Sequence, residues 1–561
     1  MHNRRIEFRR LSSTKHSALK NRSFYAVLGA LSVFFTASSV QAADSFALTY
    51  GLLEVTIKVS SLENFAKEGK TDKDLDFFLS KATPEQQAQY RTALLQKLEI
   101  DPVQLSRFFY SPTGEALLTR IGSIVNLQGG LNGKLGIRSA LIQAAFDRKE
   151  GLTLLNLFKK FPTNIRFRGE QMMALSDSIG QLINATTLFS ENLKQLSSQE
   201  AASAVATDFS KLPDLRLPGA FGVQKKQTWL LNDVSRDRKF YVDVYRPQRS
   251  TTTKTPVLVF SHGLASRPED FGDRAEHWAT YGYVVVLPQH PGSDSKQAQA
   301  LLTGLSSKLF ETEEFINRPK DLSYVIDELE RRNKSEFQGK LNLGSVGVEG
   351  HSLGGYAALA LAGAEIDFDN LQKDCDRQFG GLNLSLFVQC RALNLSRQAY
   401  TFRDRRVGAV LAANPIDSSI FGAKGLGKIQ IPVLITVGSY DPAAPAVFEG
   451  IRAFPWLTTP NKFLAMTEGQ AHVDFSQLDA GIRETIDSMA SLTLPSPTLV
   501  DNYSKGMSIA FFGTFVAQRP EYRAYLQSTY ALYLSQGQKF KLDFISAASS
   551  DKLKKSVESL K

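Results

Sequence analysis

The sequence contains few of the residues that build metal sites, redox sites or disulfide-rich scaffolds. Its 561 residues include two cysteines and seven histidines. Residues 44–200 hold no cluster of His and Cys, no glycine-rich loop and no repeated unit. After the first forty residues no stretch is long and apolar enough to cross a bilayer. We therefore expect no metal, no cofactor and no membrane span in the body of the chain.

A surplus of charge is also missing from most of the chain. The net charge is +10, but residues 1–22 hold seven Lys or Arg and one acid, which leaves +4 for everything that follows. Proteins that bind nucleic acids need a basic surface on their folded body. We expect no nucleic-acid partner, and the oligomeric state stays open.

The first 42 residues have the organisation of a secretory signal. The basic leader is followed by the apolar run "FYAVLGALSVFF" and by small residues that end at Ala42. We expect cleavage after Ala42 and export to the periplasm or the medium. An uncleaved anchor is the alternative, although the apolar run is shorter than a bilayer span. No cysteine stands at the cleavage point, so a lipid-anchored lipoprotein is not expected.

The two cysteines are Cys375 and Cys390. In an oxidising compartment they would close a short disulfide loop, and the alternative is a pair of free thiols. Export favours the disulfide, since an even number of cysteines fits that compartment.

Composition shifts divide the chain into several parts. Residues 43–200 carry apolar residues mostly at helical spacing and indicate a helical accessory domain. Pro and Gly mark a linker at 201–224, and residues 225–490 alternate strand and helix signals. Within them, 366–405 is longer than a simple crossover and predicts a lid insertion. Residues 491–561 predict a helical extension, for which core packing is favoured over substrate contact.

The strand-like segments of residues 225–490 are apolar on both faces. Continuous apolar runs indicate strands that are covered by helices on both sides of a mostly parallel sheet. The predicted fold class is therefore α/β. The segments are "RKFYVDVYRP", "PVLVFSHG", "YVVVLPQHPG", "SVGVEG", "VGAVLAANP" and "IPVLITVGS".

One serine lies between such a strand and an alanine-rich helix. The run Gly350-His351-Ser352-Leu353-Gly354 matches G-x-S-x-G, the pattern of a nucleophile elbow. The turn is tight, and a side chain at Gly350 or Gly354 would crowd the neighbouring strand or helix. The helix N-terminus that follows offers free N–H groups to developing negative charge. We predict Ser352 as a nucleophile.

A serine nucleophile needs a histidine base, and elimination leaves one. In this kind of fold the order along the chain is Ser, acid, His. His2 and His16 lie in the leader, and His351 is part of the elbow. His262, His277 and His290 precede Ser352. His472 is the base that remains, and a surface or core histidine is the alternative reading.

The acid that orients the histidine lies between Ser352 and His472. Asp441 directly follows the strand "IPVLITVGSY", at the edge of the sheet where α/β sites form. Asp417 follows the preceding strand and is the rival, whereas Glu468 is expected to be solvated. We favour Asp441, because its strand comes directly before the loop that carries the histidine.

Two backbone N–H groups are expected to form the oxyanion hole. One is the N–H of Leu353, directly after the nucleophile. The other is the N–H of Leu264, after Gly263 in "PVLVFSHGL". A simple strand-ending turn is the alternative reading of this His-Gly pair.

Residues 225–490 resemble the α/β-hydrolase superfamily. The motifs "SHGL", "HPGSDS", "GHSLGG", "GSYDPAAP" and "AHVDF" are similar to those of dienelactone-hydrolase-like and platelet-activating-factor-acetylhydrolase-like enzymes. The N-terminal part resembles a helical domain of unknown function that precedes such hydrolases in bacteria, largely cyanobacteria. The resemblance implies a triad of Ser352, Asp441 and His472. Dienelactone hydrolases proper use cysteine, so the serine here points to carboxylic esters, including lipid-like ones.

These observations predict an exported serine hydrolase that cleaves carboxylic esters through an acyl-enzyme. Two other classes remain open. A hydrolase frame can serve as a non-catalytic binding module, and the same triad supports peptidases and thioesterases.

Overall fold

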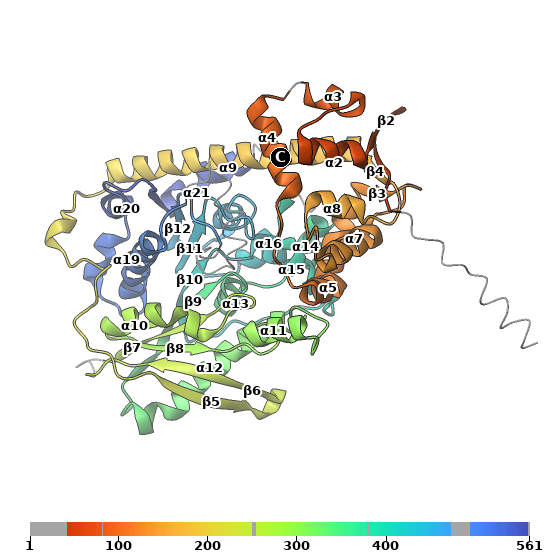
Figure 1. Cartoon of the computed structure of the whole chain (residues 1–561). Helices are drawn as coiled ribbons and strands as arrows, with labels where there is room; N and C mark the ends of the chain where they lie inside the picture. The colour runs from red at the N-terminus through yellow and green to blue at the C-terminus, as the bar shows by residue number, and fades with distance from the viewer. Residues whose placement is uncertain (1–41, 81, 250–253, 378–381, 473–493, 559–561) are drawn as a thin grey trace, which may run out of the picture.

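The structure is a computed structural model and describes residues 42–80, 82–249, 254–377, 382–472 and 494–558 (Figure 1). The expected signal, residues 1–42, lies outside the described residues except for Ala42. Among the helices of these described ranges, none combines the length and the apolar composition that crossing a bilayer requires.

A nine-stranded, mostly parallel sheet forms the centre of the molecule, so the predicted α/β class is confirmed. The strand order is β13-β12-β11-β10-β9-β7-β8-β6-β5. The pairs from β8 through β7, β9, β10 and β11 to β12 are parallel, and both edges are antiparallel. The strands are β5 (Gln227–Asp233), β6 (Arg238–Tyr245), β7 (Thr255–Ser261), β8 (Val284–Pro288), β9 (Leu341–His351), β10 (Val407–Ala413), β11 (Val433–Gly438), β12 (Lys462–Thr467) and β13 (Leu542–Ser546).

Helices cover both faces of this sheet. In β7, Val257 and Val259 enter one apolar core, and Leu258 and Phe260 enter the other, which is why the strand reads as a continuous apolar run. Helices α9, α12, α13, α14, α16 and α21 contribute to the first core, and α10, α19 and α20 to the second. Their bounds are α9 (Gly169–Ser203), α10 (Gly272–Thr280), α11 (Ser295–Thr303), α12 (Glu314–Glu336), α13 (Leu353–Ala362), α14 (Phe368–Cys375), α15 (Leu386–Gln389), α16 (Ser418–Leu426), α17 (Gly450–Ala453), α19 (Pro497–Phe515), α20 (Ser528–Leu534) and α21 (Ser550–Glu558).

The N-terminal part is mainly helical but also holds a small sheet of its own, with strand order β2-β1-β4-β3. The alternating run at its start forms β2, whereas β3 and β4 are three and four residues long, too short to show a period of two in the sequence. The elements are β1 (Ser45–Tyr50), β2 (Leu53–Lys58), α2 (Val59–Glu68), α3 (Lys73–Leu79), α4 (Pro84–Leu95), α5 (Pro102–Tyr110), α6 (Pro112–Gly122), β3 (Val125–Leu127), α7 (Lys134–Phe146), α8 (Leu154–Lys159) and β4 (Ile165–Arg168).

Helix α9 connects the two parts and belongs to both. Its N-terminal end contacts β1 and β4. Its C-terminal half buries Phe189, Leu193 and Leu196 in the first core of the main sheet. The boundary that the sequence suggested near residue 200 therefore lies at the end of a helix that both parts share (Figure 1).

Two expected segments have more structure than the sequence indicated. The linker at 201–224 packs against the second core, because Phe209 and Leu215 are buried there. The C-terminal extension at 491–561 is not wholly helical, since β13 adds an antiparallel edge strand to the main sheet. Four of its five residues are buried, with Leu542 and Phe544 in one core and Ile545 in the other, so the strand lacks the alternation that predicts one.

The contact between His277 and the linker leads to a prediction about the stability of the fold at acid pH. His277 is 5 % exposed, and its Nε2 donates to the carbonyl oxygen of Leu215 at 3.0 Å. Burial lowers the pKa of His277 to about 4, so below pH 6.5 the unfolded chain binds a proton that the folded chain excludes. Stability falls as the pH falls, and His277 accounts for roughly 2 kcal/mol between pH 7 and pH 5. In His277→Gln, which keeps the donor, urea unfolding should lose that part of the pH dependence. An unchanged difference between the two pH values would contradict the assignment.

Candidate active site

Ser352 stands at a strained turn between β9 and α13. Its φ is 56° and its ψ is −118°, a backbone conformation that residues other than glycine rarely adopt. Gly350 and Gly354, on either side of the serine, are required because neither position has room for a side chain. A Cβ added at Gly350 would lie 2.1 Å from the carbonyl oxygen of Gly354, and one at Gly354 would lie 2.0 Å from that of Ser261. The turn therefore has the shape that the G-x-S-x-G pattern predicts.

Ser352, His472 and Asp441 form one hydrogen-bonded chain. His472 Nε2 lies 2.8 Å from Ser352 Oγ, and His472 Nδ1 lies 2.7 Å from Asp441 Oδ2. A carboxylate accepts, so Nδ1–H donates to Asp441 and leaves Nε2 free to accept the proton of the serine hydroxyl. The three predicted residues come from the ends of β9 and β11 and from the loop after β12.

The backbone fixes the Asp441 carboxylate in place. Its Oδ1 accepts from the N–H groups of Ala443 at 2.9 Å and Ala444 at 2.8 Å. The side chain is 1 % exposed, and Oδ2 remains directed at His472. Asp441 is therefore both oriented and shielded from water, as an acid that aligns an imidazole must be.

The rival acid Asp417 has another environment. It is fully buried, and its N–H donates at 2.8 Å to Glu449, which lies beside it. Burial, and then the charge of Glu449, raise the pKa of Asp417 well above its ordinary value. In the structure Asp441, not Asp417, holds His472.

His351, the residue before the nucleophile, contacts the loop that carries His472, which its place in the motif did not indicate. Its Nε2 donates to the backbone carbonyl of His472 at 2.9 Å, and the centroids of the two rings are 4.8 Å apart. Burial lowers the pKa of His351 to about 3, so the ring is neutral at neutral pH. His351 therefore supports the loop that carries His472. The sequence gives no signal for this contact, because 121 positions separate the two residues.

The two expected oxyanion donors flank the serine. Leu353 is the first residue of α13, where backbone N–H groups have no partner within the helix. The loop after β7 also reaches the elbow, since a Cβ added at Gly263 would lie 3.5 Å from Ser352 Cβ. Among the residues that the structure describes, no acceptor contacts the N–H of Leu353 or Leu264. Both groups are free to donate to a substrate oxygen.

The described ranges contain a second Ser-His-Asp chain with the same bonding pattern. Ser261 Oγ lies 2.9 Å from His290 Nε2, and His290 Nδ1 lies 3.0 Å from Asp321 Oδ2. All three residues are 0 % exposed, whereas Ser352 is 8 % exposed and the His472 side chain 13 %. Asp321 is also paired with the guanidinium groups of Arg236 and Arg238. A substrate cannot reach these three buried residues. Their hydrogen bonds therefore serve to hold the surrounding segments in place.

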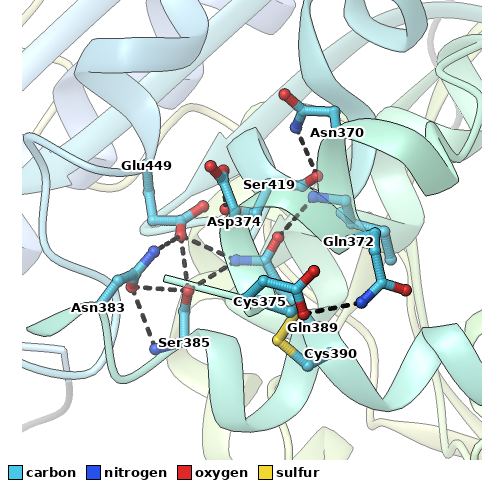
Figure 2. The surroundings of a disulfide bond; sticks show 12 residues. Asn370, Gln372, Asp374, Cys375, Asn383, Ser385, Gln389, Cys390, Ser419 and Glu449 are labelled. Carbon is cyan, nitrogen blue, oxygen red and sulfur yellow. Dashed lines mark hydrogen bonds between the residues drawn. A yellow bond between two sulfur atoms is a disulfide. The ribbon is translucent and has the colours of Figure 1, made fainter. Parts of the chain in front are cut away.

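Described residues of the insertion at 366–405 contact α16, which follows β10, the strand next to that of Ser352. A disulfide joins Cys375 at the end of α14 to Cys390 after α15, as the sequence predicts. Glu449 holds the insertion by accepting from three of its side chains (Figure 2). The donors are Asn383 and Ser385 at 2.6 Å and Gln389 at 2.8 Å.

The insertion is also tied to the elbow. The other oxygen of Glu449, Oε2, accepts from the backbone N–H groups of Asp417 and Ser418. One residue earlier, the N–H of Ile416 lies 3.5 Å from the carbonyl oxygen of Ser352. The consecutive residues Ile416, Asp417 and Ser418 thus connect the two parts, because Glu449 holds two of them to the insertion and the third contacts the nucleophile turn.

The fold, with a serine turn at the end of a central parallel strand, is that of an α/β hydrolase. Residues 42–167 match the model of a family described as an alpha/beta hydrolase of unknown function (DUF1400). That match covers the N-terminal part and ends before β5 begins. No curated protein matches the chain.

Proposed function

We propose that the protein is a serine hydrolase that cleaves carboxylic esters, with Ser352, His472 and Asp441 as its catalytic residues. The observation that carries the proposal is the hydrogen-bonded chain through His472, at a strained turn beside two free backbone N–H groups. A binding module does not need this combination of base, oriented acid and unpaired donors.

The geometry supports a two-step acyl transfer. His472 Nε2 takes the proton of Ser352 Oγ as that oxygen attacks the ester carbonyl, and Asp441 stabilises the resulting imidazolium. The N–H groups of Leu353 and Leu264 donate to the oxyanion that develops. His472 then gives its proton to the leaving alkoxide, and water, activated by the same base, cleaves the acyl-enzyme.

The proposed substrate class is carboxylic esters, including lipid-like ones. The motifs around the site resemble those of dienelactone-hydrolase-like and platelet-activating-factor-acetylhydrolase-like enzymes, and the nucleophile is a serine, not a cysteine. A peptidase or thioesterase would use the same triad. A panel of p-nitrophenyl esters, a thioester and a peptide anilide separates these classes, and we expect the esters to be cleaved fastest.

A fluorophosphonate probe tests the proposal directly, because it reacts with an activated serine. Mass spectrometry of the labelled protein should place the probe on Ser352. The matched control lies within the same chain, since Ser261 has the same bonding pattern but is fully buried. We expect no label on Ser261. A folded protein that takes up no label would support the binding-module alternative and overturn the proposal.

We also propose that the insertion forms one wall of the acyl site, and its disulfide makes this testable. The bridge spans 15 positions, and in the chain-entropy model it stabilises the fold by roughly 3 kcal/mol. The double variant Cys375→Ser/Cys390→Ser should lose about that much stability in urea unfolding. It should still hydrolyse short esters, because the triad lies outside the loop, while its preference among acyl lengths changes. An unchanged acyl-length profile would remove the insertion from the site.

Export is part of the proposal as well. It is supported by the basic and apolar leader at residues 1–42 and by the disulfide, which fits an oxidising compartment. N-terminal sequencing of the protein recovered from culture medium or periplasm should begin at Ala43. A mature protein that begins at Met1 in the cytoplasm would contradict export.

A further inference from the structure

We propose that Arg318 is a positioning residue for the oxyanion hole, a role that rests on the proposed function. It holds the peptide between Gly263 and Leu264 so that the Leu264 N–H faces the ester oxygen. The residue lies in α12, 54 positions after Leu264, and its side chain is fully buried. Nothing in the sequence analysis assigned it a part.

The Arg318 guanidinium donates to the backbone of the oxyanion loop. One nitrogen, Nη1, donates to the carbonyl oxygen of His262, and Nη2 donates to that of Gly263 at 3.2 Å. In a trans peptide the C=O and N–H groups point in opposite directions. Fixing the Gly263 carbonyl toward Arg318 therefore turns the Leu264 N–H away from Arg318. Ser352 lies beside this loop, since a Cβ added at Gly263 would lie 3.5 Å from Ser352 Cβ.

His262 supports the same carbonyl. Its Nδ1 lies 2.8 Å from the Gly263 oxygen, while its Nε2 accepts from the N–H of His290. Burial and the nearby charge of Arg318 lower the pKa of His262 far below its ordinary value, so the ring is neutral and Nδ1 carries its proton. The Gly263 oxygen thus receives two side-chain donors, and donors on a carbonyl polarise the peptide and strengthen its N–H as a donor.

The loop needs such support because its backbone is strained. Ala265 has a φ of 60°, in the left-handed region that a residue other than glycine seldom occupies. Its N–H donates to the carbonyl of Ser293 at 2.9 Å. The Ser293 hydroxyl accepts from Arg318 Nε at 2.9 Å and donates to Glu314 at 2.8 Å. Arg318 thus contacts the loop directly and also through Ser293.

Helix α12 supplies these groups from one face. Glu314, Arg318 and Asp321 are spaced by four and three residues, which places them on the same side of the helix. Asp321 holds His290, which in turn holds Ser261 and His262 at the end of β7. Buried charges seldom stabilise a fold more than apolar residues of the same size would. What the guanidinium adds here is its two bonds to the loop carbonyls.

The test is Arg318→Met, which keeps the length of the side chain and removes its donors. We expect kcat for a p-nitrophenyl ester to fall about 10- to 100-fold with KM within about twofold, part of the 10²- to 10³-fold that losing an oxyanion donor costs. The rate at which a fluorophosphonate labels Ser352 should fall in parallel. Arg318→Lys, which keeps a donor, should recover part of the loss.

Lys462→Met is the matched control. Lys462 is also buried and donates to backbone carbonyls, those of Phe454 and Leu457, but it is the first residue of β12, at the opposite end of the sheet from Ser352. The variant should lower the melting temperature and leave kcat unchanged. A folded Arg318→Met variant with kcat within twofold of wild type would overturn the proposal.

If Arg318→Met does not fold, Arg318→Lys decides. That variant keeps a positive charge among the buried carboxylates but cannot donate to both loop carbonyls as the guanidinium does, and we expect kcat to fall about 3- to 10-fold at constant KM. An unchanged kcat overturns the proposal. Hydrolysis that survives Ser352→Ala would instead contradict the proposed function. Loss of activity in Ser352→Ala together with full activity in the Arg318 variants would remove only the positioning role.

Discussion

Replacing Ser352 by alanine should lower kcat for ester hydrolysis by a factor of about 10⁴ to 10⁶ and leave the fold intact. The hydroxyl is the group that His472 Nε2 contacts at 2.8 Å, and alanine at this turn leaves no nucleophile. Steady-state rates on p-nitrophenyl acetate measure the effect, and circular dichroism checks the fold. The melting temperature should change little, because alanine removes only the hydroxyl oxygen and its one hydrogen bond to His472.

A double variant makes this prediction sharper. Residues that act as a unit in one catalytic step are not additive, so Ser352→Ala/His472→Ala should be no slower than either single variant. Separate structural roles would instead give losses that multiply. A Ser352→Ala enzyme that keeps more than a tenth of the wild-type rate would place the nucleophile elsewhere.

Asp441→Asn should lower kcat by about 10³ to 10⁴. Asp441 Oδ2 accepts from His472 Nδ1, and an amide nitrogen in its place would favour the tautomer with the proton on Nε2. That tautomer cannot take the proton of Ser352. The same assay measures the effect, and the fluorophosphonate labelling rate should fall with it.

Asp417→Asn is the matched control for this substitution. Burial and the charge of Glu449 raise the pKa of Asp417 well above its ordinary value, which favours the neutral carboxyl, and asparagine has nearly the same shape as a neutral carboxyl. We expect kcat within about twofold of wild type. A large loss here, with full activity in Asp441→Asn, would move the acid to the end of β10.

Six of the nine strands of the main sheet, β6 to β11, and the three residues of the hydrogen-bonded chain could be predicted because strong constraints act along the sequence. Strands covered on both faces read as apolar runs, as Val257 to Phe260 illustrate. The elbow needs glycines at fixed positions, and seven histidines leave one in the required order. Because few residue types can perform this chemistry, it limits the candidate site residues more than helix or strand propensity does.

The remaining features depend on contacts between distant residues. His351 meets the His472 carbonyl across 121 positions, and Arg318 reaches the loop after β7 across 55 or more. In the sequence both look like ordinary polar residues of a turn and a helix. The sequence analysis did not predict strands β5, β12 and β13. Strand β12 lies between β11 and the loop of His472, so the strand of Asp441 does not come directly before that loop, as the sequence analysis assumed. Strand β13 is short, and it pairs with β12 only after the chain has passed through α19 and α20.

Helix α9 limits how this protein could have been assembled from separate genes. A recombination that joined a new N-terminal part to the main sheet would have to fall within or before this helix. Its C-terminal half supplies Phe189, Leu193 and Leu196 to the core of the main sheet, and Ser197 and Glu200 accept from the backbone of β13. With 35 residues the helix is about 50 Å long, so every inserted or deleted residue would rotate one part about the other by roughly 100°. Only a junction that keeps the length of α9 preserves the orientation of the two parts.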